Sequence, residues 1–180
     1  MYPFARLLWQ FWRHRDDPRL GPFDPHVSRH VCLPWDLDLF GELNNGRTLT
    51  LFDLGRLPWT RRTGLWPVLR ANGWSIAVAG ASVRWRRRVF LFDRLVMRTR
   101  ALGWDERFFY SEQSLTLASG RWTGEVASHV LIRSAATDRR GLVPPARVMA
   151  ALGLAGSPPL PPWVRAWAEA DGERPWPPMP

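Results

Sequence analysis

An acidic, turn-rich segment at residues 36–46 (DLDLFGELNNG) directly precedes a stretch with helical spacing of apolar residues. Carboxylates such as Asp36 and Asp38 can act as bases or nucleophiles, but Asp is also a favoured turn and capping residue. The first N–H groups of a helix have no partner within it, so those near Asn45 and Gly46 could bind an anionic oxygen. From spacing alone, turn and cap roles are enough to account for the acidic residues.

Several other reaction centres are not predicted. The histidines lack zinc-ligand spacing, and a single cysteine cannot form a disulfide framework or a multi-cysteine metal site. The Gly-x-Ser-x-Gly motif of α/β-fold serine hydrolases, the Walker loop and the dinucleotide fingerprint are all missing from the sequence. We therefore expect no metal and no cofactor. The residues concerned are His14, His26, His30, His129 and Cys32.

The apolar pattern predicts one strand, then helices, then a run of strands. Leu49, Phe52 and Leu54 or Leu57 give the segment after residue 46 an apolar helical stripe. Pro58 should end this helix or start another, because proline is accepted in a first turn but not in a helix interior. Strands are expected at about 26–34, 74–88, 93–104, 107–118 and 122–135, and further helices at about 59–71, 144–152 and 163–170.

Short turns between the last four strands favour an antiparallel sheet. Such a sheet, when one face is solvated, needs an apolar cover on the other face, and only the helix after residue 46 is long enough to supply it. We therefore predict an α+β fold in which a long antiparallel β-sheet wraps around a central α-helix. An open edge strand would remain, and pairing with a second copy is the natural remedy, so a homodimer or a dimer of dimers is expected.

The length of 180 residues suits one domain with short additions at both ends. We expect an amphipathic helix and link at 1–22, the sheet-and-helix domain at 23–156, and a proline-rich extension with a short helix at 157–180. The first helix has two interpretations: a helix laid on the domain surface, which we favour, or an interfacial helix with weak membrane contact by residues 4–15. Its apolar stripe comprises Phe4, Leu7, Leu8, Phe11 and Trp12.

The formal charge is +9, and all 25 basic residues are arginines. An excess of positive charge attracts phosphates, nucleic acid and acidic lipid headgroups, and arginine suits bidentate phosphate contacts. No nucleic-acid motif accompanies the charge, so a nucleic-acid-binding protein is only the lowest-ranked alternative. The composition is typical of a GC-rich bacterial genome and predicts a bacterial protein. No apolar run reaches the length of a membrane span, so a cytoplasmic location is expected, with a place at the inner membrane face as the alternative.

Two motifs resemble a known family. Residues 33–56 (LPWDLDLFGELNNGRTLTLFDLGR) are similar to the thioesterase signature in which an Asp, a Gly three residues later and an Asn-Asn pair lead into a helix. Residues 83–112 contain RTRALGWDERFFY, which resembles thioesterase superfamily member six and its bacterial relatives. The resemblance covers most of 26–170. It implies a hotdog fold, dimers or larger assemblies, and thioesters of coenzyme A or acyl carrier protein as substrates.

The resemblance also implies site residues. Asp38, three before Gly41, takes the place of the acid that attacks the carbonyl or activates water in 4-hydroxybenzoyl-CoA-type thioesterases. Backbone N–H groups of Asn45 and Gly46 would then form the oxyanion hole, where one donor is worth about 3 kcal/mol. In another thioesterase branch the acid lies on the central helix, where Asp53 stands; a structural pair of Asp53 with an arginine of the same helix is the favoured alternative.

The sequence departs from the family at two positions. Glu42 stands where a histidine is common, and Thr48 where a tyrosine is usual. A second acid close to Asp38 could assist acid–base work or mark an altered activity, and both alternatives remain open. The main alternative to hydrolysis is therefore a non-catalytic hotdog protein that binds acyl thioesters or lipids. Candidate substrate-binding residues are Leu49, Phe52 and Trp59 for the acyl chain and Arg84, Arg86 and Arg88 for phosphates.

Overall fold

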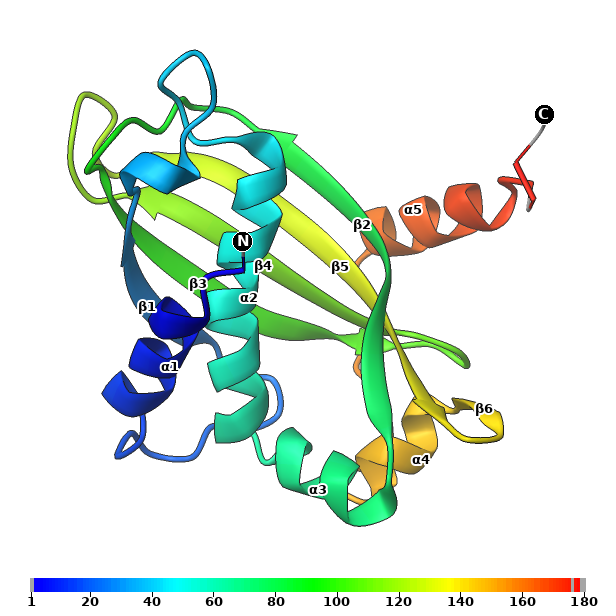
Figure 1. Cartoon of the computed structure of the whole chain (residues 1–180). Coiled ribbons are helices and arrows are strands. Elements are labelled where there is room, and N and C mark those ends of the chain that lie inside the picture. The colour runs from blue at the N-terminus through cyan, green and yellow to red at the C-terminus, as the bar shows by residue number, and fades with distance from the viewer. Residues whose placement is uncertain (1, 176, 179–180) are drawn as a thin grey trace.

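The computed structural model describes residues 2–175 and 177–178 of the chain. A curved antiparallel sheet has the strand order β1-β3-β4-β5-β2, and a short β6 pairs with β5 (Figure 1). The strands are β1 (His26–Val31), β2 (Ser75–Trp85), β3 (Arg94–Trp104), β4 (Phe109–Leu117), β5 (Val126–Asp138) and β6 (Gly141–Val143). The helices are α1 (Phe4–Arg13), a 3-10 turn η1 (Pro34–Asp36), α2 (Asn45–Arg62), α3 (Leu65–Asn72), α4 (Pro145–Ala150) and α5 (Pro162–Gly172).

The long helix α2 lies in the concave side of the sheet, as Figure 1 shows. Leu51, Phe52 and Leu54 on α2 are completely buried and pack in one core cluster with residues of β3, β4 and β5. Gly55 lets the helix approach closely, because a Cβ there would overlap the side chain of Met97 on β3. The predicted arrangement, a long antiparallel sheet wrapped around a central helix, is therefore confirmed.

The terminal helix α5 covers part of the other face of the sheet. Along β5, Val130 and Ile132 belong to the core against α2, whereas Leu131 between them belongs to the cluster that contains Val164 of α5. Alternate residues of a strand point to opposite faces, so the sheet is packed on both sides here. The proline-rich tail thus returns to the sheet and ends in a helix that buries Val164 completely.

Two details of the predicted elements were wrong. Pro58 neither ends nor starts a helix, since α2 continues through it to Arg62. Proline forfeits one backbone hydrogen bond, but Pro58 and Trp59 are buried by tertiary contacts that hold the helix together. The short strand β6 was not predicted, because three residues at the end of a hairpin are too few for a recognisable apolar pattern.

The two edges of the sheet are treated differently. Side chains of α1 donate to edge carbonyls of β1: Arg6 Nη2 to Val31 O at 2.9 Å and Gln10 Nε2 to Arg29 O at 3.2 Å. Strand β2 ends the sheet on the other side, and its exposed positions include the small residues Ala77 and Ala81. The β1 edge is thus partly capped, whereas the β2 edge is available for pairing.

Two buried histidines make the stability of the fold sensitive to acid. Arg62 Nη1 donates to His26 Nδ1 at 2.9 Å, so this nitrogen is an acceptor and the ring is neutral. Burial lowers the pKa of His26 and of His30 to about 3, well below the unfolded value of about 6.5. Between these values the unfolded chain binds more protons, so stability is full above the unfolded pKa and declines as the pH falls.

We expect the free energy of unfolding to fall by about 1.4 kcal/mol per pH unit for each of these histidines below about pH 6.5. Urea unfolding at about pH 7 and about pH 5 measures the change. His30→Asn should roughly halve the dependence of the unfolding free energy on pH, since it deletes one of the two histidines. Equal unfolding free energies at both pH values would contradict neutral, buried histidines.

Candidate functional site

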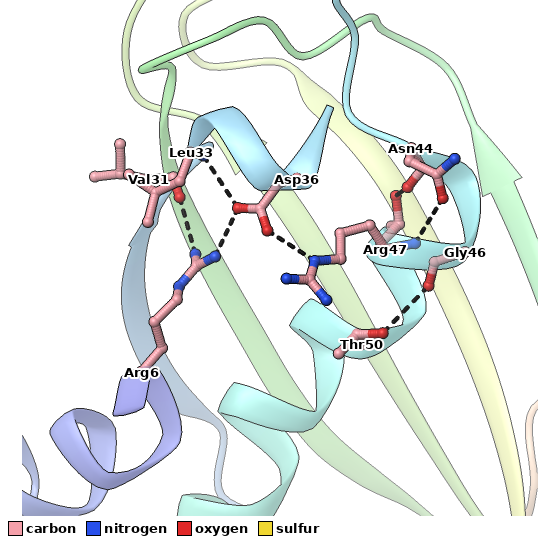
Figure 2. Close-up of polar contacts among 9 residues, drawn as sticks. Arg6, Val31, Leu33, Asp36, Asn44, Gly46, Arg47 and Thr50 are labelled. Atoms are coloured by element: carbon pink, nitrogen blue, oxygen red, sulfur yellow. Dashed lines mark hydrogen bonds and ion pairs between the residues drawn. The ribbon is translucent and has the colours of Figure 1, made fainter. Parts of the chain in front are cut away.

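The N-terminal end of α2 presents backbone donors at the molecular surface. Asn44 is its N-cap, and its Oδ1 accepts the N–H of Arg47 at 3.0 Å (Figure 2). Asn45 and Gly46, both exposed, stand in the first turn, where helix geometry provides no acceptor for their N–H groups. Of the two adjacent asparagines, Asn44 therefore caps the helix. An anionic oxygen would meet two N–H groups and the positive end of the helix dipole here.

A cavity of about 220 Å³ opens beside this helix end. Asn45 and Thr48 of α2 form one wall, and Ser128 of β5 lies on another. Glu42 lines the cavity, and its Oε1 lies 3.2 Å from Nη1 of Arg88. The remaining lining residues are Leu43, Trp85, Arg86, Arg87, Val89 and Ala127. Its cationic rim is suited to a ligand that carries phosphate groups.

Arg84 does not join this cationic group. It lines a different cavity of about 310 Å³ together with His129 and Trp163, whereas Arg86 and Arg88 line the cavity at the helix end. The separation follows from the end of β2 at Trp85: Arg84 lies within the strand, whereas Arg86 and Arg88 lie beyond it and no longer follow its alternation. The three candidate phosphate-binding arginines are therefore divided between two places.

Asp38 closes the turn before α2. Its Oδ1 accepts the N–H groups of Phe40 at 2.9 Å and Glu42 at 3.2 Å, and its own N–H donates to Glu42 O at 2.8 Å. Gly41 has φ 74°, a left-handed conformation that suits glycine in this turn. Asp38 is half-buried, and the 220 Å³ cavity includes Glu42 rather than Asp38 among the described residues that line it. The turn role is thus present in the structure, next to the helix end.

The neighbouring Asp36, by contrast, is completely buried. Its Oδ2 lies 2.6 Å from Arg6 Nη1, its Oδ1 lies 2.9 Å from Arg47 Nε, and Leu33 N–H donates to Oδ2 at 3.0 Å. The backbone oxygen of Asp36 also accepts the N–H of Asn44 at 2.9 Å. Asp36 therefore ties α1, the end of β1 and the start of α2 together, and positions the helix end.

The sequence did not predict that Asp36 would be the buried acid of the two. The two acids are separated by one residue and share the same turn-forming context, so no local pattern distinguishes the buried one. Arg47, an arginine of the same helix as Asp53, pairs with Asp36. The only hint in the sequence was the presence of Arg6 and Arg47 as possible partners of a buried acid. They converge on Asp36 only once α1 has packed against the domain.

A larger cavity of about 580 Å³ lies between α2, α3 and the sheet. Trp59 lines it, whereas Phe52 is fully buried in the main core and Leu49 is exposed at the surface. Asp53 and Arg56 form a polar spot on the wall and are paired with each other, the alternative favoured for Asp53. Most other lining residues are apolar, among them Leu65, Leu69, Trp74, Trp104 and Phe109. The volume falls in the range of about 300–1,000 Å³ typical of small-molecule sites.

The polar spot is anchored by buried partners. Arg56 Nη1 donates to Oε1 of the buried Gln113 at 3.2 Å, and burial lowers the pKa of Arg56. Tyr2 donates its hydroxyl to Asp53 Oδ2 at 3.3 Å, and burial followed by the charge of Asp53 raises the pKa of Tyr2 to about 12. Gln113 Nε2 donates to Phe52 O and Thr99 Oγ1, each at 2.8 Å. The pair of Asp53 and Arg56 is thus held in a fixed place on an otherwise apolar wall.

Comparison with known proteins places this architecture in a family. The model of the thioesterase-like superfamily matches residues 32–168. Protein THEM6 of Xenopus laevis is 38% identical over 88 residues, which cover 49% of this chain and 42% of that protein. Protein THEM6 of Danio rerio is 36% identical over 111 residues, 61% of this chain and 55% of the relative. The chain thus spans about half the length of these curated relatives. Both are animal proteins, which corrects the bacterial source predicted from composition.

Solved structures show the same fold. The probable thioesterase YbaW from Escherichia coli superposes with a TM-score of 0.63 at 16% identity, over 71% of this chain and 98% of that one. Slr0204 from Synechocystis, a 1,4-dihydroxy-2-naphthoyl-CoA thioesterase, gives a TM-score of 0.60 at 11% identity, over 72% and 95% of the two chains. Similarity at this level concerns the hotdog fold itself. Together with the family match, it shows that the chain belongs to the thioesterase-like superfamily.

Proposed function

We propose that the protein hydrolyses acyl thioesters of coenzyme A or acyl carrier protein to a free acid and a thiol. The observation that carries this proposal is the N-terminus of α2, where Asn45 lines a cavity that Arg86, Arg87 and Arg88 also line. Helix geometry leaves the N–H groups of Asn45 and Gly46 without an acceptor inside the helix. The thioester carbonyl oxygen would lie at these groups, and the phosphates of coenzyme A near Arg86 and Arg88. Membership of the thioesterase-like superfamily supports this assignment.

Asp38 is the base or nucleophile of the proposed reaction. Its Oδ1 is held by two N–H groups of the turn, which leaves Oδ2 to activate a water or to attack the carbonyl carbon. As the tetrahedral oxygen becomes negative, the donors at the start of α2 stabilise it, and the thiol leaves when the carbonyl re-forms. Glu42 is the second candidate acid, because it lines the cavity beside the proposed carbonyl position.

The 580 Å³ cavity is the proposed acyl site. Its apolar wall suits a hydrocarbon or aromatic acyl group, and the pair of Asp53 and Arg56 offers one polar contact. The start of β2 (Ser75 and Ile76) lines this cavity, whereas Trp85 at its other end lines the 220 Å³ cavity. If two copies paired antiparallel along β2, the acyl cavity of one protomer would lie beside the helix-end cavity of its partner.

The proposed homodimer makes a first prediction. Ala77→Glu with Ala81→Glu places charges on the exposed edge strand of both copies, and repulsion should shift the molecule from twice the chain mass of 20.8 kDa to the single-chain mass. Light scattering after size-exclusion chromatography measures the mass. Val27→Glu, at an exposed position on the α1-capped edge strand β1, is the matched control and should leave the dimer intact. A wild-type monomer, or a dimer lost only in the Val27 variant, would contradict pairing along β2.

The phosphate contacts make a second prediction. Arg86→Ala with Arg88→Ala should raise KM for acyl-CoA at least about tenfold with little change in kcat, because each lost charge-assisted contact is worth about 1.5–3 kcal/mol. The KM for an acyl-N-acetylcysteamine thioester, which lacks phosphates, should not change. Arg84→Ala, on the separate cavity, is the control. An equal rise in KM for both substrates would remove phosphate binding from these arginines.

The function itself is tested by thiol release from a panel of acyl-CoAs of increasing chain length and of aromatic type. Saturable turnover with at least one class supports hydrolysis. The second candidate function, binding without catalysis, is favoured by one observation: the carboxylate of Asp38 is engaged in its turn and lies outside the described lining of the 220 Å³ cavity. Calorimetric binding of acyl-CoA without turnover across the panel would establish this alternative and reject the first.

A further inference from the structure

Helix α1 presents its polar side to the domain. Arg6 pairs with the buried Asp36, and the side chain of Gln10 is buried against the β1 edge. Leu7 and Phe11 are partly buried on this same side, Leu7 against the main core and Phe11 against the ring of Trp66. The apolar stripe expected from the sequence is therefore divided, and the helix is held by hydrogen bonds and ion pairs as much as by apolar contact.

The opposite side of α1 is apolar and exposed. Phe4, Leu8, Trp9 and Trp12 are 67%, 67%, 54% and 53% exposed, and their spacing places them on one side of the helix. The rings of Trp9 and Trp12 stack with centroids 4.8 Å apart. Figure 1 shows α1 on the outside of the molecule, beside α2 and β1. Large side chains grouped in this way on a surface mark an interaction site rather than isolated exposed residues.

Rotation of α1 about its axis, with its apolar side turned inward, would cost stability. Turning the four exposed side chains inward would pull Arg6 away from Asp36 and leave a buried carboxylate with one ion-pair partner fewer. The same rotation would remove the hydrogen bonds from Arg6 and Gln10 to the edge of β1. The buried ion pair therefore fixes the apolar side of α1 toward the outside.

Positive charge lies next to the apolar side, at the C-terminal end of the helix and in the groove beside it. Residues Phe4–Arg13 contain no acidic residue, and the exposed Arg13 and Arg15 lie at the C-terminal end of the helix. The guanidinium of Arg15 lies 4.6 Å from the centroid of the Trp12 ring. A groove of about 470 Å³ between α1 and the sheet is lined by Trp9 and by Arg6, Arg29 and Arg94. An anionic membrane surface offers acyl chains to apolar side chains, an interfacial region to tryptophans and phosphates to arginines, and this part of the molecule presents all three kinds of side chain.

We propose that α1 docks the protein onto an anionic lipid bilayer. The helix lies in the plane of the interface, with Phe4, Leu8, Trp9 and Trp12 at the boundary of the acyl chains. Arg13 and Arg15 contact lipid phosphates, and the groove beside Trp9 accepts a headgroup. Within the part of the chain that the structure describes, no helix is long and apolar enough to span a bilayer. The docking is independent of the proposed hydrolysis.

Cosedimentation of the full chain with vesicles tests the proposal, using phosphatidylcholine alone and phosphatidylcholine mixed with phosphatidylglycerol. We expect binding to the mixed vesicles that weakens at high salt. Leu8→Ser with Trp12→Ser should lower the partition coefficient at least tenfold, and Arg13→Gln with Arg15→Gln should remove the preference for phosphatidylglycerol. Leu142→Ser with Trp163→Ser, at positions 49% and 46% exposed elsewhere, is the matched control and should bind as the wild type does.

Fluorescence quenching by bromine-labelled lipids provides a second measurement, made on the wild type and on one conservative variant. Quenching that disappears in Trp9→Phe with Trp12→Phe supports insertion of these rings. Two results would overturn the proposal. One is equal vesicle binding by the wild type and the Leu8/Trp12 variant. The other is absence of vesicle binding together with a self-association that the Leu8/Trp12 variant abolishes, which would show that a second copy covers α1.

Discussion

Asp38→Asn should lower kcat for acyl-CoA hydrolysis by about 10²–10⁴-fold while the protein remains folded. The amide oxygen of asparagine can still accept the N–H groups of Phe40 and Glu42, so the turn before α2 is retained. What the substitution removes is the negative charge that activates water or attacks the carbonyl carbon. Initial rates of thiol release give kcat and KM, and far-ultraviolet circular dichroism with a thermal melt confirms folding.

Glu42→Gln distinguishes the role of Glu42 from that of Asp38. Its side chain lines the cavity and pairs with Arg88, so a change in KM is expected, but the proposed base remains in place. A loss of kcat in the Glu42 variant with near-normal turnover in the Asp38 variant would transfer the base role to Glu42. Full turnover by Asp38→Asn would in itself exclude Asp38 from the chemistry.

Asp36→Ala should cost about 3–5 kcal/mol of folding stability, because it leaves two arginines without the buried carboxylate that pairs with them. For a chain of this size that corresponds to a lowering of Tm by roughly 10 °C. Urea unfolding followed by circular dichroism measures the loss. The variant should also weaken the attachment of α1, since Arg6 would lose its ion pair with Asp36 and retain its hydrogen bond to Val31 O.

Asp16→Ala is the matched control for this loss. Asp16 also pairs with an arginine, Arg15, at 3.1 Å, but its side chain is 81% exposed. Surface pairs of this kind contribute about 0–1 kcal/mol, so little change is expected. Similar losses in the two variants would contradict the structural role assigned to the buried Asp36.

The fold was predictable because its signals are local. Alternating apolar residues and short turns indicated β2 to β5. Of the predicted helical stripe, Phe52 and Leu54 are buried on the helix that the sheet encloses, whereas Leu49 is exposed. Pro58 was misjudged because the cost of proline in a helix is a local quantity, whereas the contacts that offset it come from the rest of the fold.

The candidate site was predictable only in part. The motif around Gly41 and Asn44 located the helix end, since turn and cap chemistry depends on neighbouring residues. The burial of Asp36 and the inverted orientation of α1 could not be predicted. Both depend on Arg6, which comes 30 residues before its partner and reaches it only after α1 has packed against β1.

The central claim is that the thioester carbonyl of the substrate lies between the Asp38 carboxylate and the first turn of α2. A crystal structure of the protein with a non-hydrolysable acyl-CoA analogue tests it most directly. The account predicts the analogue's carbonyl oxygen at hydrogen-bond distance from the N–H groups of Asn45 or Gly46, and its carbonyl carbon about 3–3.5 Å from an Asp38 carboxylate oxygen or from a water that this oxygen holds. An analogue bound with its carbonyl away from this helix end, or with Asp38 remote from the carbonyl carbon, would contradict the account.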